Sequence, residues 1–302
     1  MIRSEWPLIS SGSPVDAMED LSAKLRLLKG KVKDWTMTKS MEMKDKSILL
    51  EDEINSLLKS STSGILGARD QSRLIALRLE LKRWLDHELL SARLQSRVTW
   101  ALQGDANTKF FHAVASARKN HNAIWGLEDE EGKQVVDDLG IKALGVWYFK
   151  NIFADDNLTK IDAQLNAIRL FPSFISPEKK VSFTRQITLA EVEEALKSFK
   201  KDKSLGPDGW PVEFYLAFFD ILGLELVRVV ESSRREGRVA PSMNSTFIAL
   251  IPKKEKHISF ADFCPISLCN LVYKLISKVA ALRLKPFLDK FISPHQFGFL
   301  KN

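Results

Sequence analysis

Two long runs of apolar residues at helical spacing constrain the N-terminal third of the chain more than any other feature. Each run places a large apolar residue every three or four positions, the repeat of one face of an α-helix. The first comprises Leu21, Leu25, Leu28, Val32 and Trp35, and the second comprises Leu74, Leu77, Leu81 and Trp84, continued by Leu90, Leu94 and Val98. The small, polar segment KSSTSGILG at 59–67 separates them. The pattern predicts a long helical hairpin whose second helix runs from about Ala68 to Ala101.

The rest of this hairpin's surface is basic. The first helix carries Lys24, Arg26, Lys29, Lys31 and Lys33 largely off its apolar stripe, and the second carries Arg73, Arg78, Lys82, Arg83, Arg93 and Arg97. Charged residues on a helix usually form its solvated face, which favours a packed structural support. A coiled-coil interaction module and an arm that contacts nucleic-acid phosphates stay open as alternatives.

The composition of the chain fits a globular protein with a polyanionic partner. Of 302 residues, 45% are hydrophobic and 27% charged, and the formal net charge is +7. The length suffices for one large or two modest domains. The positive excess is compatible with nucleic acid or an anionic membrane surface as a partner, although many basic proteins bind neither. The two cysteines, Cys264 and Cys269, give no disulfide framework and too few ligands for zinc. Packed thiols in a reducing compartment are expected.

No segment has the pattern of a secretory signal or a membrane span. The N-terminus MIRSEWPLISSGSP lacks the apolar core of a signal peptide. The most apolar long stretch, at 214–230, is interrupted by Asp220, Glu225 and Arg228. We therefore expect a soluble intracellular protein, nuclear or cytoplasmic, that is not secreted and has no membrane partner.

Shorter signals organise the chain after residue 120. AIWGLEDEEGKQVVD at 123–137 places two apolar runs around a DEEGK turn, which predicts a small β-hairpin, and a helix through WYFKNIF follows. Thr188 and Glu191 form a capping-box pattern at the start of another helix. These signals divide the chain into a basic helical hairpin at 1–120, a connector at 121–185 and a C-terminal part at 186–302.

The C-terminal part contains a turn-rich loop and a strand, each with basic residues beside it. The loop has Gly206, Pro207, Asp208 and Gly209 in succession, next to Lys201 and Lys203. Proline and aspartate favour a turn and glycine permits close approach, so the loop suits a phosphate or a plain connection. Residues 246–251 predict a strand that ends at Pro252, with Lys253 at its exit. Asn270 is placed to cap the helix that follows.

The order of these motifs resembles the reverse transcriptase region of plant non-long-terminal-repeat retrotransposons of the long interspersed element class. The matching segments are QGDANTKFFHAVASARKN, the EDEEGK hairpin with WYFKNIF, KSLGPDGWPVEFY, NSTFIALIPK, DFCPISLCNLVYKLISKVAALRLKPFL and ISPHQFGF. They occur in the family's order over roughly residues 70–302. The resemblance implies an α+β, mainly helical fold. In it, a long N-terminal helical hairpin and linker precede the fingers and the start of the palm of a right-hand polymerase, a partial reverse transcriptase domain.

The chemistry of the family is two-metal nucleotidyl transfer with Mg²⁺, which aspartates of the palm hold. In the family these aspartates follow the segment that ISPHQFGF resembles. We therefore expect no catalytic residue, metal or small-molecule cofactor in this chain. The residues Phe153, Ala154, Asp155 and Asp156 spell the family's Tyr/Phe-x-Asp-Asp box. Because they follow a predicted helix and precede the fingers motifs, we interpret them as an exposed helix end.

The resemblance also implies which residues contact nucleotide or template. They are Lys203, Gly206, Pro207, Asp208, Gly209, Lys253, Asp262 and Gln296. Lys253 matches a basic residue that approaches the phosphates of the incoming nucleotide. Cys264 occupies the position of the arginine in the family pattern Asp-Phe-Arg-Pro-Ile-Ser-Leu. A thiol lacks the charge and the fixed donors of a guanidinium, so the change indicates weakened activity.

Three interpretations of function follow. The first is a truncated reverse transcriptase fragment, an RNA-directed DNA polymerase by class and inactive as this chain, with residual binding of RNA or an RNA/DNA hybrid. The second is a helical protein-interaction module built on the N-terminal hairpin. The third is an incomplete gene model of an active reverse transcriptase. The sequence leaves the oligomeric state open.

Overall fold

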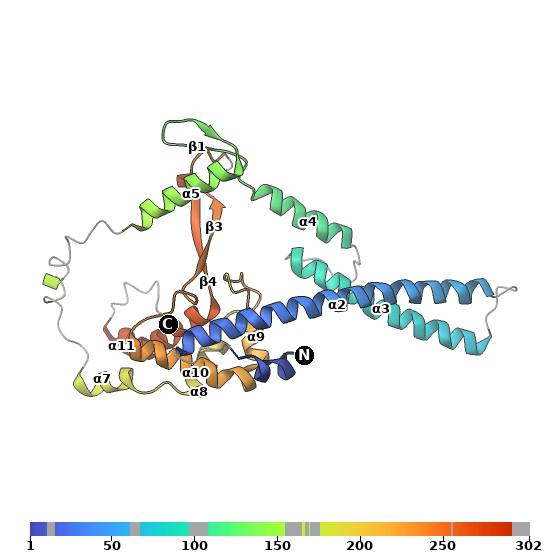
Figure 1. The fold of residues 1–302 in the computed structure, drawn as a ribbon, viewed down its shortest axis with the longest axis horizontal. Coiled ribbons are helices and arrows are strands. Elements are labelled where there is room, and N and C mark those ends of the chain that lie inside the picture. Colours follow the sequence, from blue (N-terminus) through green and yellow to red (C-terminus); the bar gives the residue numbers. More distant parts are fainter. Residues whose placement is uncertain are drawn as a thin grey trace. The chain divides into compact units, whose positions relative to one another are not determined.

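The structure is a computed structural model that describes residues 1–10, 16–60, 67–96, 108–154, 165–166, 169, 176–254 and 256–291. The chain divides into two compact units: unit 1 comprises Met1–Gly30 with Gly126–Asn302, and unit 2 comprises Lys31–Trp125. The described elements are predominantly helices, and the strands among them form two sheets of two strands each (Figure 1). None of the helices in the described ranges combines the length and the apolar character needed to cross a membrane.

Unit 2 contains the expected pair of long helices. α2 (Ala17–Ser60) enters this unit at Lys31, and α3 (Ala68–Ser96) follows the predicted break. Leu50, Ile54 and Leu74 are buried between them, and Lys46 and Glu80 form an ion pair at 2.7 Å. α4 (Thr108–His121) packs on α3 through Phe111.

Three helices form the core of unit 1. They are α8 (Leu189–Lys197), α10 (Phe219–Glu236) and α11 (Leu271–Phe291). Their apolar faces bury Val192, Leu196, Leu222, Leu226 and Leu275 almost completely. The predicted capping box is confirmed, because the Thr188 side chain accepts from the Glu191 N–H while Glu191 accepts from the Thr188 N–H. The remaining helices of unit 1 among the described residues are α1 (Ile2–Glu5), η1 (Trp6–Leu8), α5 (Asp138–Phe153), α7 (Pro177–Thr184), α9 (Val212–Ala217) and η3 (Phe260–Asp262).

The N-terminal residues 1–30 are part of unit 1. Leu21, Leu25 and Leu28, which begin the first apolar stripe, are at most 4% exposed. The Trp6 indole N–H donates to Glu225 at 3.2 Å, and the Lys24 ammonium contacts the same carboxylate at 3.4 Å. Sequence patterns grouped residues 1–120 together, whereas in the structure the first 30 residues pack with the C-terminal part. An apolar stripe shows which face of a helix is buried, but it does not show which segment covers that face.

An arginine inside unit 1 ties α11 to α8. The Arg283 side chain is 9% exposed and contacts both oxygens of Glu191 at 3.0 Å. Its remaining N–H groups donate to the carbonyls of Phe183, Arg185 and Gln186 at 2.8–3.1 Å. All five guanidinium donors are therefore used. The hydrogen bond from Arg283 is the main reason that the pKa of Glu191 is lowered to about 2.

Two antiparallel pairs of strands complete unit 1. β1 (Leu127–Glu128) pairs with β2 (Gln134–Val135), which confirms the predicted small hairpin. β3 (Thr246–Pro252) pairs with β4 (Phe263–Cys269) from Thr246 opposite Cys269 to Pro252 opposite Phe263. β3 was predicted, and β4, which contains the cysteine-bearing motif, was not. We call this pair of strands the ribbon.

Candidate functional site

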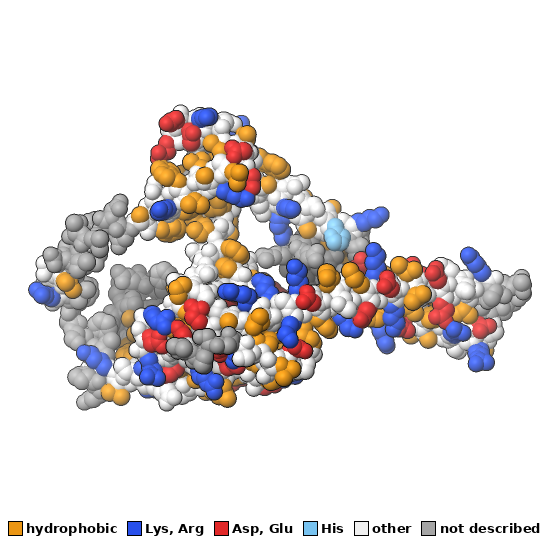
Figure 2. Space-filling view, in the orientation of Figure 1, with side chains coloured by type: hydrophobic (Ala, Val, Ile, Leu, Met, Phe, Trp, Pro, Cys, Tyr) orange, Lys and Arg blue, Asp and Glu red, His pale blue; other side chains and the backbone are white. Residues whose placement is uncertain are grey.

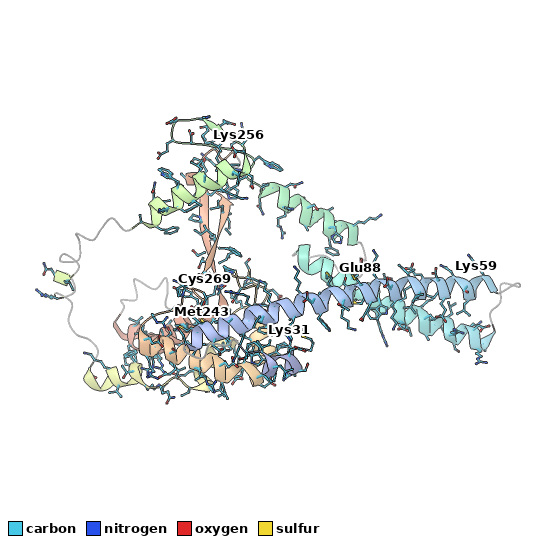
Figure 3. All side chains as sticks on the ribbon, in the orientation of Figure 1. Lys31, Lys59, Glu88, Met243, Lys256 and Cys269 are labelled. Atoms are coloured by element: carbon cyan, nitrogen blue, oxygen red, sulfur yellow. The ribbon has the colours of Figure 1, made fainter. Side chains whose placement is uncertain are left out.

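Six of the eight residues implied by the resemblance lie near the two ends of the ribbon. One end, the base, lies at Thr246 and Cys269, and the other, the tip, lies at Pro252 and Phe263. Figure 3 labels Cys269 at the base and Lys256 near the tip. Seven paired residues at about 3.3 Å each place the ends about 20 Å apart. Gly206–Gly209 belong to the base, whereas Lys253, Asp262 and Cys264 belong to the tip.

At the base, the glycine-rich loop fits closely against the start of α11. A Cβ on Gly206 would lie 2.6 Å from the backbone N and the Oδ1 of Asn270, so only glycine permits this approach. The Gly209 N–H donates to the Gly206 carbonyl at 3.1 Å, and Gly209 has a φ of 78°, which favours glycine. The sequence predicted this turn, and its close partner is a finding of the structure.

Asn270 fixes the base through its side chain. This residue is 3% exposed, and its Oδ1 accepts from the Asp208 N–H at 3.0 Å. Its Nδ2 donates to the carbonyls of Met243 at 3.2 Å and Ser242 at 3.4 Å. The side chain therefore joins the loop to the turn before β3. The sequence predicted Asn270 as a helix cap but not this role, because the partners are 27 to 62 residues away.

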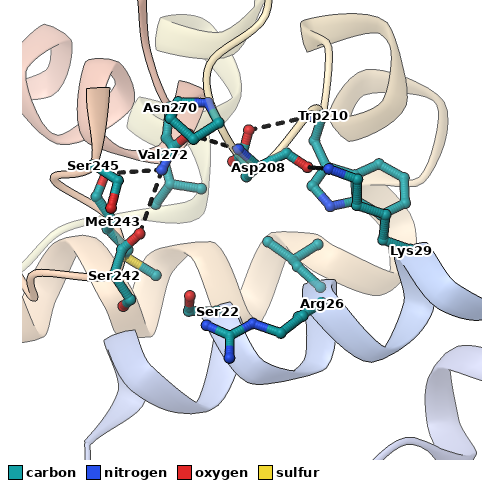
Figure 4. A pocket seen from close by; sticks show the side chains of 12 residues that line it. Ser22, Arg26, Lys29, Asp208, Trp210, Ser242, Met243, Ser245, Asn270 and Val272 are labelled. Carbon is teal, nitrogen blue, oxygen red and sulfur yellow. Dashed lines mark hydrogen bonds between the residues drawn. The ribbon is translucent and has the colours of Figure 1, made fainter. Parts of the chain in front are cut away.

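A cavity of about 220 Å³, the base pocket, opens beside these residues (Figure 4). Its walls come from α2, the glycine-rich loop, the turn before β3 and the start of α11. The α2 wall presents Ser22, Arg26 and Lys29 next to Leu25. The other walls comprise Pro207, Asp208, Trp210, Ser242, Met243, Ser245, Asn270 and Val272. Ser22, Arg26 and Lys29 recur at spacings of four and three, a polar stripe that could have been recognised beside the apolar one.

Some charged side chains of the base pocket have hydrogen-bond partners among the described residues, and one does not. The Lys29 ammonium donates to the Asp208 carbonyl at 2.9 Å. Burial raises the pKa of the Asp208 carboxyl, while hydrogen bonds from Trp210 and Gly209 and the charge of Lys29 oppose that rise. Within the described residues, the exposed guanidinium of Arg26 has no hydrogen bond or ion pair.

At the tip, Lys253 and Cys264 come from different motifs and lie at the same end of the ribbon. Cys264 is opposite Ile251 in the register, and Lys253 directly follows the last residue of β3. The Lys253 N–H donates to the Asp262 carbonyl at 2.8 Å, and its ammonium donates to the Ala261 carbonyl at 2.9 Å. Cys264 is an exposed free thiol. The tip therefore carries the Lys253 ammonium and the Cys264 thiol at one end of the ribbon.

Asp262 organises the backbone of the tip. Its Oδ1 lies 2.8 Å from the Lys254 ammonium, and its Oδ2 accepts from the N–H groups of Ile258 at 2.9 Å and Ser259 at 3.2 Å. The Lys254 hydrogen bond is the first of the causes that lower the pKa of Asp262 to about 2. Asp262 therefore holds the tip together. We call Lys253, Lys254, Asp262 and Cys264 the tip cluster.

Aromatic rings and one backbone bond attach the tip to other parts of unit 1. Phe260 stacks on Tyr148 of α5 at 5.7 Å between centroids and meets Phe149 edge-on at the same distance. The Glu128 N–H of β1 donates to the Ile258 carbonyl at 2.7 Å. The tip is thus held by ring packing, whereas the base is held by buried polar groups.

Four other implied or considered positions fall elsewhere. Lys203 is exposed and lines a cavity of about 130 Å³ with Gly206. Gln296, Asp155 and Asp156 lie outside the described residues. α5 ends at Phe153, which is 63% exposed, so the described half of the Phe-Ala-Asp-Asp sequence is a helix end.

Within the part of the chain that the structure describes, no group of three or more histidine, cysteine, aspartate or glutamate side chains could hold a metal ion.

Comparison with known proteins relates the chain to a protein of a transposable element. The similar protein is the Transposon TX1 uncharacterized 149 kDa protein of Xenopus laevis, with 30% identity over 205 residues, or 68% of this chain. The match spans 16% of that protein's length. No protein-family model matches the chain. The similarity supports an origin from a transposon.

Proposed function

We propose that this chain carries the nucleic-acid- and nucleotide-binding fingers of a reverse transcriptase from a non-long-terminal-repeat retrotransposon. The similarity to a transposon protein supports the origin, and the ordered motifs support the polymerase class. The plant affiliation belongs to the same proposal. The polymerase reaction would belong to a protein that also carries the family's metal-binding aspartates.

The observation that carries the proposal is the pairing of two separate motifs at the tip. The strand before Lys253 and the strand of Cys264 form one ribbon, so the two positions that the family uses for phosphate contact lie at the same end of it. A lysine approaches phosphate as a point charge, while an arginine adds a two-pronged donor. Because Cys264 stands in the second position, the tip keeps the lysine of that arrangement and lacks the arginine. Weak binding of phosphate is the activity that these residues support.

Restoring the arginine is the direct test. Cys264→Arg should strengthen binding of a fluorescent nucleoside triphosphate or a short labelled RNA to the full chain about 10-fold, the effect of one added charge-assisted contact. Ser267→Arg adds the same charge on the opposite face of β4 and is the matched control. Lys253→Gln should weaken the binding that remains. Equal affinities for the two arginine variants would count against the proposal.

A second candidate function rests on the surface of unit 2. Several large apolar side chains of its helical hairpin are exposed, among them Trp35, Met37, Met41, Leu49 and Ile75 at 48–66%. Figure 2 shows hydrophobic, basic and acidic side chains interspersed along α2 and α3. Apolar exposure of this kind favours a protein-interaction module. Light scattering of the full chain at high salt distinguishes the two: a discrete oligomer supports the module, whereas a monomer that binds RNA only at low salt supports the first proposal.

A further inference from the structure

The base pocket is a second place where the chain can hold an anion. Its α2 wall brings a guanidinium, an ammonium and a hydroxyl to one cavity through Arg26, Lys29 and Ser22. Two further hydroxyls, of Ser242 and Ser245, come from the turn before β3, and that of Ser245 donates to the Pro241 carbonyl at 3.2 Å. Residues from segments about 200 positions apart thus present hydrogen-bond donors to one space.

Two of these donors have no partner in the part of the chain that the structure describes. The Ser242 hydroxyl is buried without a hydrogen bond, although it lines the cavity. The Arg26 guanidinium has neither a hydrogen bond nor an ion pair there, and Figure 4 shows it extending along the pocket toward Ser22. Buried polar groups normally have partners, so the unsatisfied Ser242 hydroxyl indicates a missing partner, and the exposed Arg26 guanidinium has open donors at the same cavity.

The one acidic side chain of the pocket does not fill that need. The Asp208 carboxylate accepts from the Trp210 N–H at 3.2 Å, and the hydrogen bond from Gly209 also acts on it. It is therefore engaged by its own loop. Lys29 uses one donor on the Asp208 carbonyl and has two left. Two positive charges against one engaged negative charge give the cavity a net attraction for an anion.

The size and donor set of the pocket fit a phosphate group. About seven water volumes of roughly 30 Å³ would fill 220 Å³, enough for a phosphate and several ordered waters. Arginine binds phosphate with two parallel N–H donors, and serine hydroxyls supply single donors. We propose that the base pocket binds a phosphate group, either of a nucleic-acid backbone or of a free nucleotide. The identity of the ligand rests on the proposed function, whereas phosphate binding itself does not.

Three variants distinguish a local site from a general charge effect, because each of them lowers the net charge by one. Arg26→Gln removes the free guanidinium, and Ser245→Asp places a negative charge on the opposite wall. Arg228→Gln is the matched control, because Arg228 is an arginine of α10 outside the base pocket. Long-range electrostatics alone predict the same effect for all three.

Inorganic phosphate tests the pocket independently of the family assignment. Phosphate should raise the thermal midpoint of the wild-type chain more than chloride at equal ionic strength, because it binds the folded state. Arg26→Gln and Ser245→Asp should lose that excess, and Arg228→Gln should keep it. An excess that is absent in the wild type, or equal in all four proteins, overturns the proposal.

Labelled single-stranded RNA and a fluorescent nucleoside triphosphate then identify the source of the phosphate. Arg26→Gln and Ser245→Asp should weaken one of the two probes about 10-fold, as expected for a lost charge-assisted contact. If the probe is RNA, Arg26→Gln should also reduce the slope of log affinity against log salt by about 0.7. If the wild-type protein binds phosphate but binds neither probe, the proposed function alone is contradicted. If a probe binds more weakly to Lys253→Gln, while Arg26→Gln binds it no more weakly than Arg228→Gln does, the pocket proposal alone is contradicted.

Discussion

The two ends of the ribbon hold residues of the same family resemblance in opposite ways. At the base, buried Asn270 joins the glycine-rich loop, the turn before β3 and the start of α11 through hydrogen bonds. At the tip, Asp262 bonds to its own short segment, and Phe260 packs on rings of α5. The base depends on contacts between distant segments, whereas the electrostatic order of the tip is local. Changes at the base should therefore affect the stability of unit 1, and changes of charge at the tip should affect binding.

The largest expected effect is the acid sensitivity of the ion pair that holds α11, the helix that starts at the base. The pKa of Glu191 is about 2 in the folded protein against an ordinary value of 4.5. Its contribution to stability is fully present above pH 4.5 and is lost as the pH falls toward 2. The shift corresponds to about 3 kcal/mol, which solvent contact of the carboxylate reduces to about 2 kcal/mol.

Urea unfolding of the wild type and of Glu191→Gln at a series of pH values measures this contribution. The variant should show a shallower loss of stability between pH 4.5 and 2, because the side-chain amide that replaces the carboxylate does not titrate. The same slope in both proteins would mean that the ion pair does not contribute to acid sensitivity.

The next effect concerns the close approach at the base. Gly206→Ala would place a Cβ 2.6 Å from backbone and side-chain atoms of Asn270, and the shift that this requires should destabilise the protein by about 1.5 kcal/mol. Gly30→Ala is the matched control, since a Cβ there meets nothing within 4 Å inside helix α2. It should stabilise the protein by about 0.5 kcal/mol. Thermal unfolding reports both, and changes of the same sign would remove the steric argument.

The smallest effect on stability is expected at the tip. Asp262→Asn loses the ion pair with Lys254 but keeps an oxygen that can accept a backbone hydrogen bond. The unfolding midpoint should fall only slightly, while hydrogen exchange at the amides of Ile258 and Ser259 becomes faster. A clear fall in the midpoint would show that the tip is coupled to the core as tightly as the base is.

Local sequence signals predicted the elements of the fold better than their partners. The capping box at Thr188 and the small β-hairpin were predicted correctly because each depends on a few neighbouring residues. β4 was missed because Pro265 lacks an N–H and argues against a strand. Within the described residues β4 pairs with β3 alone, so the proline has an unpaired side to face.

The candidate sites divide in the same manner. The glycine-rich turn and the lysine after β3 could be found in the sequence, because glycine, proline and a basic strand exit are local patterns. The base pocket could not, because Arg26 and Asp208 are brought to one cavity by packing of segments far apart in the chain. The polar stripe of α2 could be recognised in the sequence, but the segments that form the other walls of the pocket could not.

Arg283 shows that not every positive charge of the chain is available to bind a polyanion. All five of its donors are committed to carbonyls and to Glu191, so none is open to a phosphate. The cations available to a polyanion are those with open donors, such as Arg26 among the described residues. Two chains with the same formal charge but different internal pairing should therefore differ in affinity for nucleic acid. For basic proteins of this kind, the number of uncommitted guanidinium and ammonium groups is a better guide than the net charge.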